Sequence, residues 1–125
     1  MLNIINHVID TIENNTNLFS SISLDTLPAE NGIYCEITPG YNSQEYLNRS
    51  NNKVIPLLFL CKNTDQSVCV ETLDKICSYI EKVKQYPQTT GFTWVNSTVA
   101  TSPNKVGKDE RYFIYSCIVN IEVYY

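Results

Sequence analysis

A chain of 125 residues with 43% hydrophobic content has the size and composition of one globular domain, which excludes an intrinsically disordered segment. Its 9 basic and 13 acidic residues give a net charge of -4, and the basic residues are spread along the sequence. Because phosphate contacts need clustered lysine and arginine, this pattern argues against a nucleic-acid-binding protein. The five cysteines, without a signal-peptide pattern, predict reduced core thiols in a cytoplasm, and a single histidine makes a zinc site unexpected.

Apolar residues at helical spacing predict a short helix near the N-terminus. They run from Leu2 to Ile12, and a polar run of asparagines ends the pattern. His7 falls on the polar side of this helix, where we expect an exposed side chain. The Ser-rich residues 18–27 that follow predict either a short strand around Ile22 or an extended connector.

A strand and a long polar loop come next. Alternation of apolar and polar residues over Ile33–Ile37 predicts a half-buried strand, which a Pro-Gly pair ends. Residues Tyr41–Lys53 contain few apolar side chains and predict a long loop. The loop includes Tyr41, Tyr46 and Arg49, residue types that are enriched at protein interfaces, although a plain hairpin tip would have a similar sequence.

The stretch Val54–Tyr86 is the centre of the predicted fold. Its first residues, VIPLLFLC, form the most apolar run of the chain and predict a strand covered on both faces. The spacing then becomes helical, with Asn63 or Asp65 as the cap. The helix ends at Tyr86 because the residue before a proline avoids helical angles.

This helix is predicted to cover the core. We expect Leu73, Ile76 and Ile80, which recur on one helix face, to be buried. Their expected partners are Leu58 and Leu60 of the preceding strand, together with the C-terminal strand. All five cysteines fall within apolar patterns, which is typical of small core residues.

The last third of the chain predicts an antiparallel hairpin. Alternating aromatic and β-branched residues over Phe92–Thr101 favour a strand. Ser102–Asp109 predicts a polar turn with Lys105 and Lys108 in it, and a long strand over Glu110–Tyr125 completes the hairpin.

The order of the predicted elements indicates an α+β protein. We expect a single domain over residues 1–125 with a mainly antiparallel four-stranded sheet, and with the N-terminal helix and the long central helix packed on one face. The central pair of strands should be Val54–Asn63 and the C-terminal strand.

Motifs for catalysis are absent from the sequence, so we do not expect an enzyme, a cofactor or a bound metal. Tyrosine is abundant, with nine residues, and tyrosine suits protein contacts because it combines a large ring with a polar tip. The residues expected at a protein interface are Tyr41, Tyr46, Arg49, Lys105, Lys108 and Arg111.

Three stretches carry a resemblance to a known family. They read LPAENGIY, IPLLFLCKNTDQ and VATSPNKVGKDERYFIYSCIVNI, and they follow an N-terminal helix in that order. In this order of elements the chain resembles the minor capsid proteins of tailed bacteriophages, and among them the tail terminators. The resemblance extends over nearly the whole chain but includes no motif of functional residues.

The resemblance implies a non-enzymatic virion protein at the head–tail neck, made in the host cytoplasm. It implies a homohexameric ring that caps the tail tube and joins it to the head connector. The implied partners are other copies of the chain, the tail tube protein, the head connector and neck proteins, and the tail sheath if the tail is contractile. DNA would pass through the ring without specific binding, and no membrane is involved.

Two alternatives fit the same sequence, one within virion assembly and one of a different class. A head-completion protein or connector adaptor would share the small α+β domain and the interface residues. An intracellular ligand-binding or regulatory α+β domain would differ by being a stable monomer.

Overall fold

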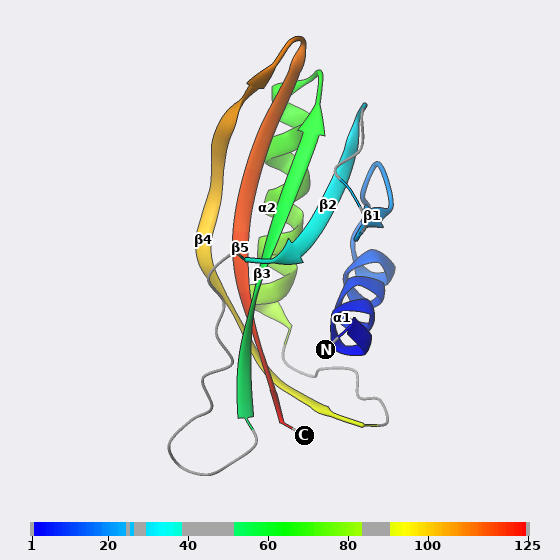
Figure 1. Cartoon of the computed structure of the whole chain (residues 1–125), viewed down its shortest axis with the longest axis vertical. Helices are drawn as coiled ribbons and strands as arrows, with labels where there is room; N and C mark the ends of the chain where they lie inside the picture. Colours follow the sequence, from blue (N-terminus) through cyan, green and yellow to red (C-terminus); the bar gives the residue numbers. More distant parts are fainter. Residues whose placement is uncertain (1, 25, 27–29, 39–51, 84–90, 125) are drawn as a thin grey trace.

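The computed structural model describes residues 2–24, 26, 30–38, 52–83 and 91–124. It is an α+β fold with two helices and a five-stranded mixed sheet in the order β1-β2-β3-β5-β4 (Figure 1). The elements are α1 (Leu2–Asn15), β1 (Ile22–Ser23), β2 (Gly32–Ile37), β3 (Asn52–Asn63), α2 (Gln66–Lys82), β4 (Thr93–Asp109) and β5 (Tyr112–Tyr124). Neither helix is long and apolar enough to span a membrane.

Strands β3 and β5 form the centre of the sheet, which confirms the predicted central pair. They run antiparallel and stay in register from Asn52 opposite Tyr124 to Asn63 opposite Phe113. Residues 39–51, which hold most of the predicted polar loop, lie outside the described residues.

The expected four-stranded sheet gains a fifth strand, which makes it mixed. The two-residue strand β1 pairs in parallel with β2, with Ile22 opposite Ile33. The carboxylate of Glu13 at the end of α1 accepts a hydrogen bond of 2.8 Å from the Ile22 N–H. This contact fastens β1 to α1 and thereby holds the connector beside the edge of β2.

The predicted turn at Ser102–Asp109 is wrong, because these residues continue β4. The strand has 17 residues and β5 has 13, and four register shifts accommodate the difference. Pro103 lies within one of the shifts, where its missing N–H costs no ladder bond. The turn itself is formed by Glu110 and Arg111, with Glu110 at a φ of 55°.

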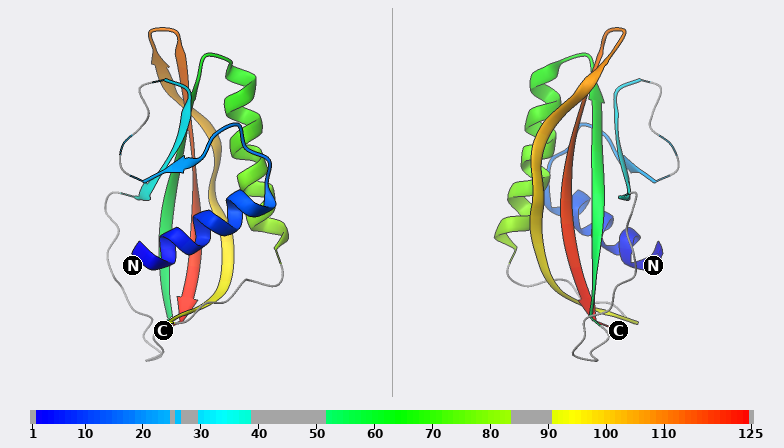
Figure 2. Two further views of the ribbon diagram at one scale, coloured as in Figure 1. Left: turned by 90° about the vertical axis from the view of Figure 1, so that its right-hand side faces the viewer. Right: turned by 60° about the vertical axis from the view of Figure 1, so that its left-hand side comes forward.

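One face of the sheet holds the hydrophobic core. Buried side chains alternate along β3 and β5, and they form one cluster with buried residues of both helices. In the right-hand view of Figure 2 both helices lie behind the long strands, on the same side of the sheet. The core residues of β3 and β5 are Ile55, Leu57, Phe59, Cys61, Tyr115, Cys117, Val119, Ile121 and Val123.

Leu73, Ile76 and Ile80 of α2 are buried as predicted, and α2 packs against the C-terminal strand β5 as expected. The other expected partners, Leu58 and Leu60, are wrong. Leu57 faces the helices, as do Ile55 and Phe59, whereas Leu58 and Leu60 are half-buried on the opposite face. Side chains of a strand alternate between faces, so an error of one position moves each of them to the other face. A continuous apolar run contains no alternation from which the face can be determined.

The start of α2 agrees with the predicted cap. Asp65 is the N-cap, and its Oδ1 accepts a hydrogen bond of 3.0 Å from the Ser67 N–H. Asn63 supports this turn by accepting a bond of 2.8 Å from the Asp65 N–H. The helix ends at Lys82, and the predicted end at Tyr86 lies outside the described residues.

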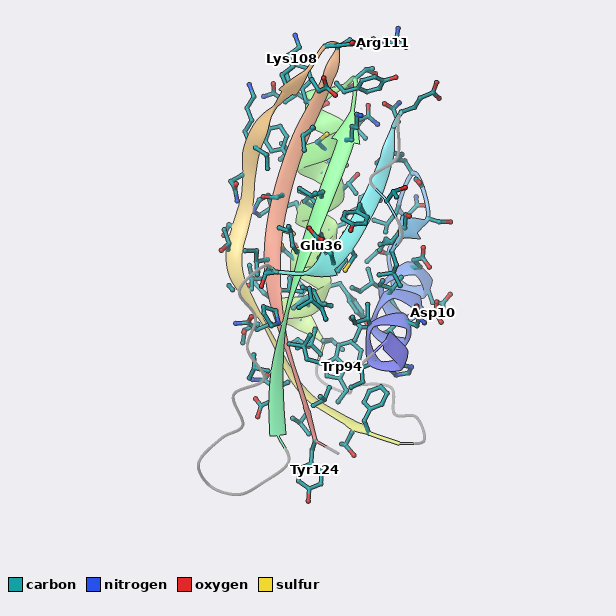
Figure 3. All side chains as sticks on the ribbon, viewed as in Figure 1. Asp10, Glu36, Trp94, Lys108, Arg111 and Tyr124 are labelled. Atoms are coloured by element: carbon teal, nitrogen blue, oxygen red, sulfur yellow. The ribbon has the colours of Figure 1, made fainter. Side chains whose placement is uncertain are left out.

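His7 differs from its predicted exposed state. It is half-buried, and its ring meets the rings of Phe92 and Trp94 edge-on at centroid distances of 5.6 and 6.1 Å. Trp94 points from β4 toward α1 (Figure 3). Aromatic edge-to-face contacts of this kind help to join the first helix to the far end of the sheet.

Candidate protein interface

Three of the six predicted interface residues lie together at the end of the β4–β5 hairpin. Lys105 and Lys108 come from β4, and Arg111 belongs to the turn. Figure 3 shows Lys108 and Arg111 at one end of the molecule, far from Tyr124 at the other. The remaining three predicted residues, Tyr41, Tyr46 and Arg49, lie outside the described residues.

The cations of this end lie over two aromatic rings at the start of β5. Lys105 and Lys108 place their Nζ atoms 5.4 and 5.0 Å from the ring centre of Phe113. The Arg111 guanidinium lies 5.4 Å from the ring of Tyr112 and donates to its hydroxyl at 3.4 Å. Cation–π contacts hold long, flexible side chains in place, so the charges are presented from a more ordered surface.

A fourth cation, Lys62 at the end of β3, was missed by the sequence reasoning. It is 7% exposed, lies 4.9 Å from the ring centre of Tyr112, and pairs with Asp109 at 3.9 Å. A buried ammonium is costly without such partners, so Lys62 favours this arrangement of Tyr112 and Asp109. We call Lys62 and residues 105–113 the hairpin end.

The gathering of these four cations corrects the impression of evenly spread charge. Lys62 and Lys105 are far apart in the sequence but close in the fold, because the ends of β3 and β4 flank the start of β5. Within the described part of the chain, Lys105 and Lys108 form no ion pair. The hairpin end therefore presents unneutralised positive charge on a chain with a net charge of -4.

The sheet face opposite the helices is a second candidate surface. No described helix covers it, and alternate residues of β3 and β5 place apolar side chains there. Near the start of β3 and the end of β5 this face becomes polar. A shallow depression of about 280 Å³ there is lined by Val54, Asn96, Thr98, Asn120 and Glu122. The six half-buried apolar residues, called the open-face stripe, are Val54, Pro56, Leu58, Leu60, Ile114 and Ile118.

The outer edge of β4 is a third candidate. The strand lies at one end of the strand order, so its outer backbone groups are not paired within the sheet. Its second half contains proline, two lysines and bulges, features that discourage the addition of another strand. Its first half, Thr93–Thr101, has no charged residue and no proline.

A groove of about 350 Å³ lies between the end of α1 and the outer side of α2. Lys75 crosses it and donates a hydrogen bond of 2.9 Å to the Asn17 carbonyl. The groove is lined by Asn15, Thr16, Asn17, Asp74, Lys75, Ser78, Tyr79 and Lys82.

The cysteine thiols are placed in the core. All five cysteines are free and buried. Burial raises the pKa of Cys35 to about 12, and a hydrogen bond with Cys77 together with burial raises the pKa of Cys117. Thiols of raised pKa are poor nucleophiles at neutral pH. Among the described residues, no three His, Cys, Asp or Glu side chains are grouped so that they could hold a metal ion.

Comparison of the sequence with protein-family models and with curated proteins gave no match.

Proposed function

We propose that this protein is a structural subunit of a tailed-phage virion, a tail terminator that forms a homohexameric ring. In this role it caps the tail tube and joins it to the head connector. The proposal starts from the resemblance of the sequence to that family. The observation that carries it is the asymmetry of the sheet, which has helices on one face and the open-face stripe on the other.

The open-face stripe supports a role in assembly. Half-buried apolar side chains on a sheet face that no described helix covers are a favourable surface for burial against another protein. Leu58 and Leu60 lie beside Ile118 and Ser116 of β5, so the stripe crosses the two central strands. Because these strands are the most extensively paired of the sheet, the stripe is held rigid before any partner binds.

A ring subunit has to contact two neighbours, the tube and the neck, and three of the surfaces described above are available for these contacts. The open-face stripe, the edge of β4 and the hairpin end belong to different sides of one domain. Heterologous contacts between identical subunits close into a ring when the rotation allows it. A terminator then ends polymer growth because its tube-facing and neck-facing surfaces differ.

The proposed partners are other copies of the chain, the tail tube protein, the head connector and neck proteins, and a sheath if the tail is contractile. DNA would pass through the ring without specific binding. A head-completion protein or connector adaptor is a closely related alternative, with the same need for several protein-binding surfaces.

A second class of function is favoured by one observation, the groove between α1 and α2. Its mixture of amide, hydroxyl, ammonium and carboxylate groups would suit a small polar ligand of an intracellular regulatory domain. Such a domain would work as a monomer, so the molecular mass in solution separates the two classes.

The experiment is electron microscopy of the purified protein together with light scattering. We expect rings with six-fold symmetry and a mass of six subunits. In a phage with the gene disrupted, tails should be overlong or should fail to join heads, while heads still package DNA. A protein that stays monomeric at every concentration, with tails of normal length that join heads in the disrupted strain, would refute the proposal.

A further inference from the structure

Two exposed valines mark surfaces of opposite charge on this molecule. Val106 of β4 is 59% exposed and lies between Lys105 and Lys108 in the sequence. Val70 of α2 is 40% exposed and is followed by the exposed carboxylates Glu71 and Asp74. We call Val70, Glu71 and Asp74 the α2 patch.

The positive surface is available for a partner. Val106 occupies an irregular position of β4, between the paired residues Lys105 and Gly107, so it is displaced from the regular ladder. Lys105 and Lys108 contact the Phe113 ring but form no ion pair within the described residues. Glu30 interacts electrostatically with Arg111, and Asp109 forms an ion pair with Lys62. The charges of Lys105 and Lys108 therefore stay available for a partner.

The α2 patch is negative for a structural reason as well. Asp74 and Glu71 lie one turn apart on the outer side of the helix. Lys75, the nearest cation on α2, donates its ammonium protons to the Asn17 carbonyl at the end of α1. Its ammonium is thereby held toward α1, in the groove that Asp74 also lines. Within the described residues, Glu71 and Asp74 form no ion pair.

The distribution of charge favours another copy of this chain as the partner. The hairpin end holds four cations and the two carboxylates of Asp109 and Glu110, a formal charge of +2. The rest of the chain holds five cations and eleven carboxylates, a formal charge of -6. Two hairpin ends repel each other, whereas a hairpin end and the acidic remainder of a second copy attract.

We infer that the hairpin end of one copy docks on the α2 patch of the next copy. Val106 lies against Val70, and Lys105 and Lys108 meet Glu71 and Asp74. An apolar centre with opposite charges around it is a common composition for a small protein contact. The inference rests on the proposed ring and assigns one of its lateral interfaces.

The test is a charge swap measured by light scattering. The first variant carries Lys105→Glu and Lys108→Glu, the second carries Glu71→Lys and Asp74→Lys, and the third carries all four changes. We expect each of the first two to associate about tenfold more weakly or worse than the wild type. The third should regain the wild-type mass, and so should an equimolar mixture of the first two.

A control variant separates a specific contact from a change of net charge. Asp10→Lys with Glu81→Lys alters the charge as much as the α2 variant does, at exposed residues outside both patches. It should keep the wild-type mass, and circular dichroism should give all variants similar denaturation midpoints. Added salt should weaken association of the wild type, because screening acts on exposed charges.

The outcomes for the contact and for the ring are distinguishable. Rings that still form in both charge-reversed variants would overturn the contact. A loss of association that the variant with all four substitutions does not restore would also overturn it. Both outcomes leave the ring intact. A wild type that stops at dimers, with rescue by the swap, supports the contact and refutes the hexameric ring. A wild type that is monomeric throughout refutes both.

Discussion

Replacing two neighbouring leucines of β3 provides a sharp test of the fold. Leu57 is 1% exposed in the core, opposite Val119 of β5, whereas Leu58 is half-buried on the open face beside Ile118. The two residues have the same side chain, lie in the same strand and differ only in the face on which they lie. Substitution of each by alanine therefore isolates the effect of packing against the helices.

The magnitudes follow from burial. Leu57→Ala removes a side chain from a packed core and leaves a cavity, which should cost about 2–5 kcal/mol in the free energy of unfolding. Leu58→Ala removes a side chain that keeps part of its contact with water, and its cost should be about 1 kcal/mol. The test is whether Leu57→Ala lowers the free energy of unfolding several-fold more than Leu58→Ala does.

Urea denaturation followed by circular dichroism provides the measurement, at a protein concentration where all variants have the same mass. The slope of the unfolding free energy against urea should stay constant between variants, so that the change in midpoint reports stability. Equal costs for the two substitutions would refute the assignment of faces. A larger cost for Leu58→Ala would reverse it and would restore the packing expected from the sequence.

Two further predictions concern the helix cap at Asp65 and the backbone conformation at Gly91. Asp65→Ala should lower the denaturation midpoint and Asp65→Asn should largely keep it, because asparagine also caps helices. Hydrogen bonds from Ser67 lower the pKa of Asp65 in the folded protein. The stabilisation by the Asp65 carboxylate is therefore present above the unfolded pKa of about 3.9 and is lost as the pH falls through the folded pKa. A pH titration of stability should show this loss in the wild type and a smaller one in Asp65→Asn; equal profiles would contradict it. Gly91→Ala should cost about 1 kcal/mol or more because Gly91 has a φ of 104°, whereas Gly107→Ala, a substitution that meets no atom within 4 Å, should be nearly neutral. Similar midpoints for the two alanine variants would contradict the assigned backbone at Gly91.

The features that the sequence predicted well are those with a clear period or a clear boundary. The α2 stripe of Leu73, Ile76 and Ile80 has helical spacing, and Asp65 stands where the spacing changes. The long alternation of β5 identifies a strand and separates its two faces. Such patterns depend on neighbours within one element, so they can be recognised without knowledge of the rest of the fold.

Other features depend on contacts between elements and could not be predicted in this way. The strand character of Ser102–Asp109 arises from pairing with β5, which overrides the turn preference of its Ser, Pro, Asn and Gly residues. Strand β1 exists because Glu13 of α1 and the edge of β2 hold Ile22. For Leu57 and Leu58, the face is set by the register against β5 rather than by any difference between the side chains.

The hairpin end shows how strand pairing creates a surface that composition does not reveal. Net charge counts residues, and it gave no reason to expect a positive site on an acidic chain. Pairing of β5 with both β3 and β4 brings Lys62 and Lys105 to the same end, and Tyr112 and Phe113 provide the rings on which the cations lie. In the proposed docking, the contact runs from the positive hairpin end of one copy to the negative α2 patch of the next. Directional contacts between identical subunits are what the proposed ring requires. The proposed docking would provide them through charge, whereas the open-face stripe would act through apolar burial.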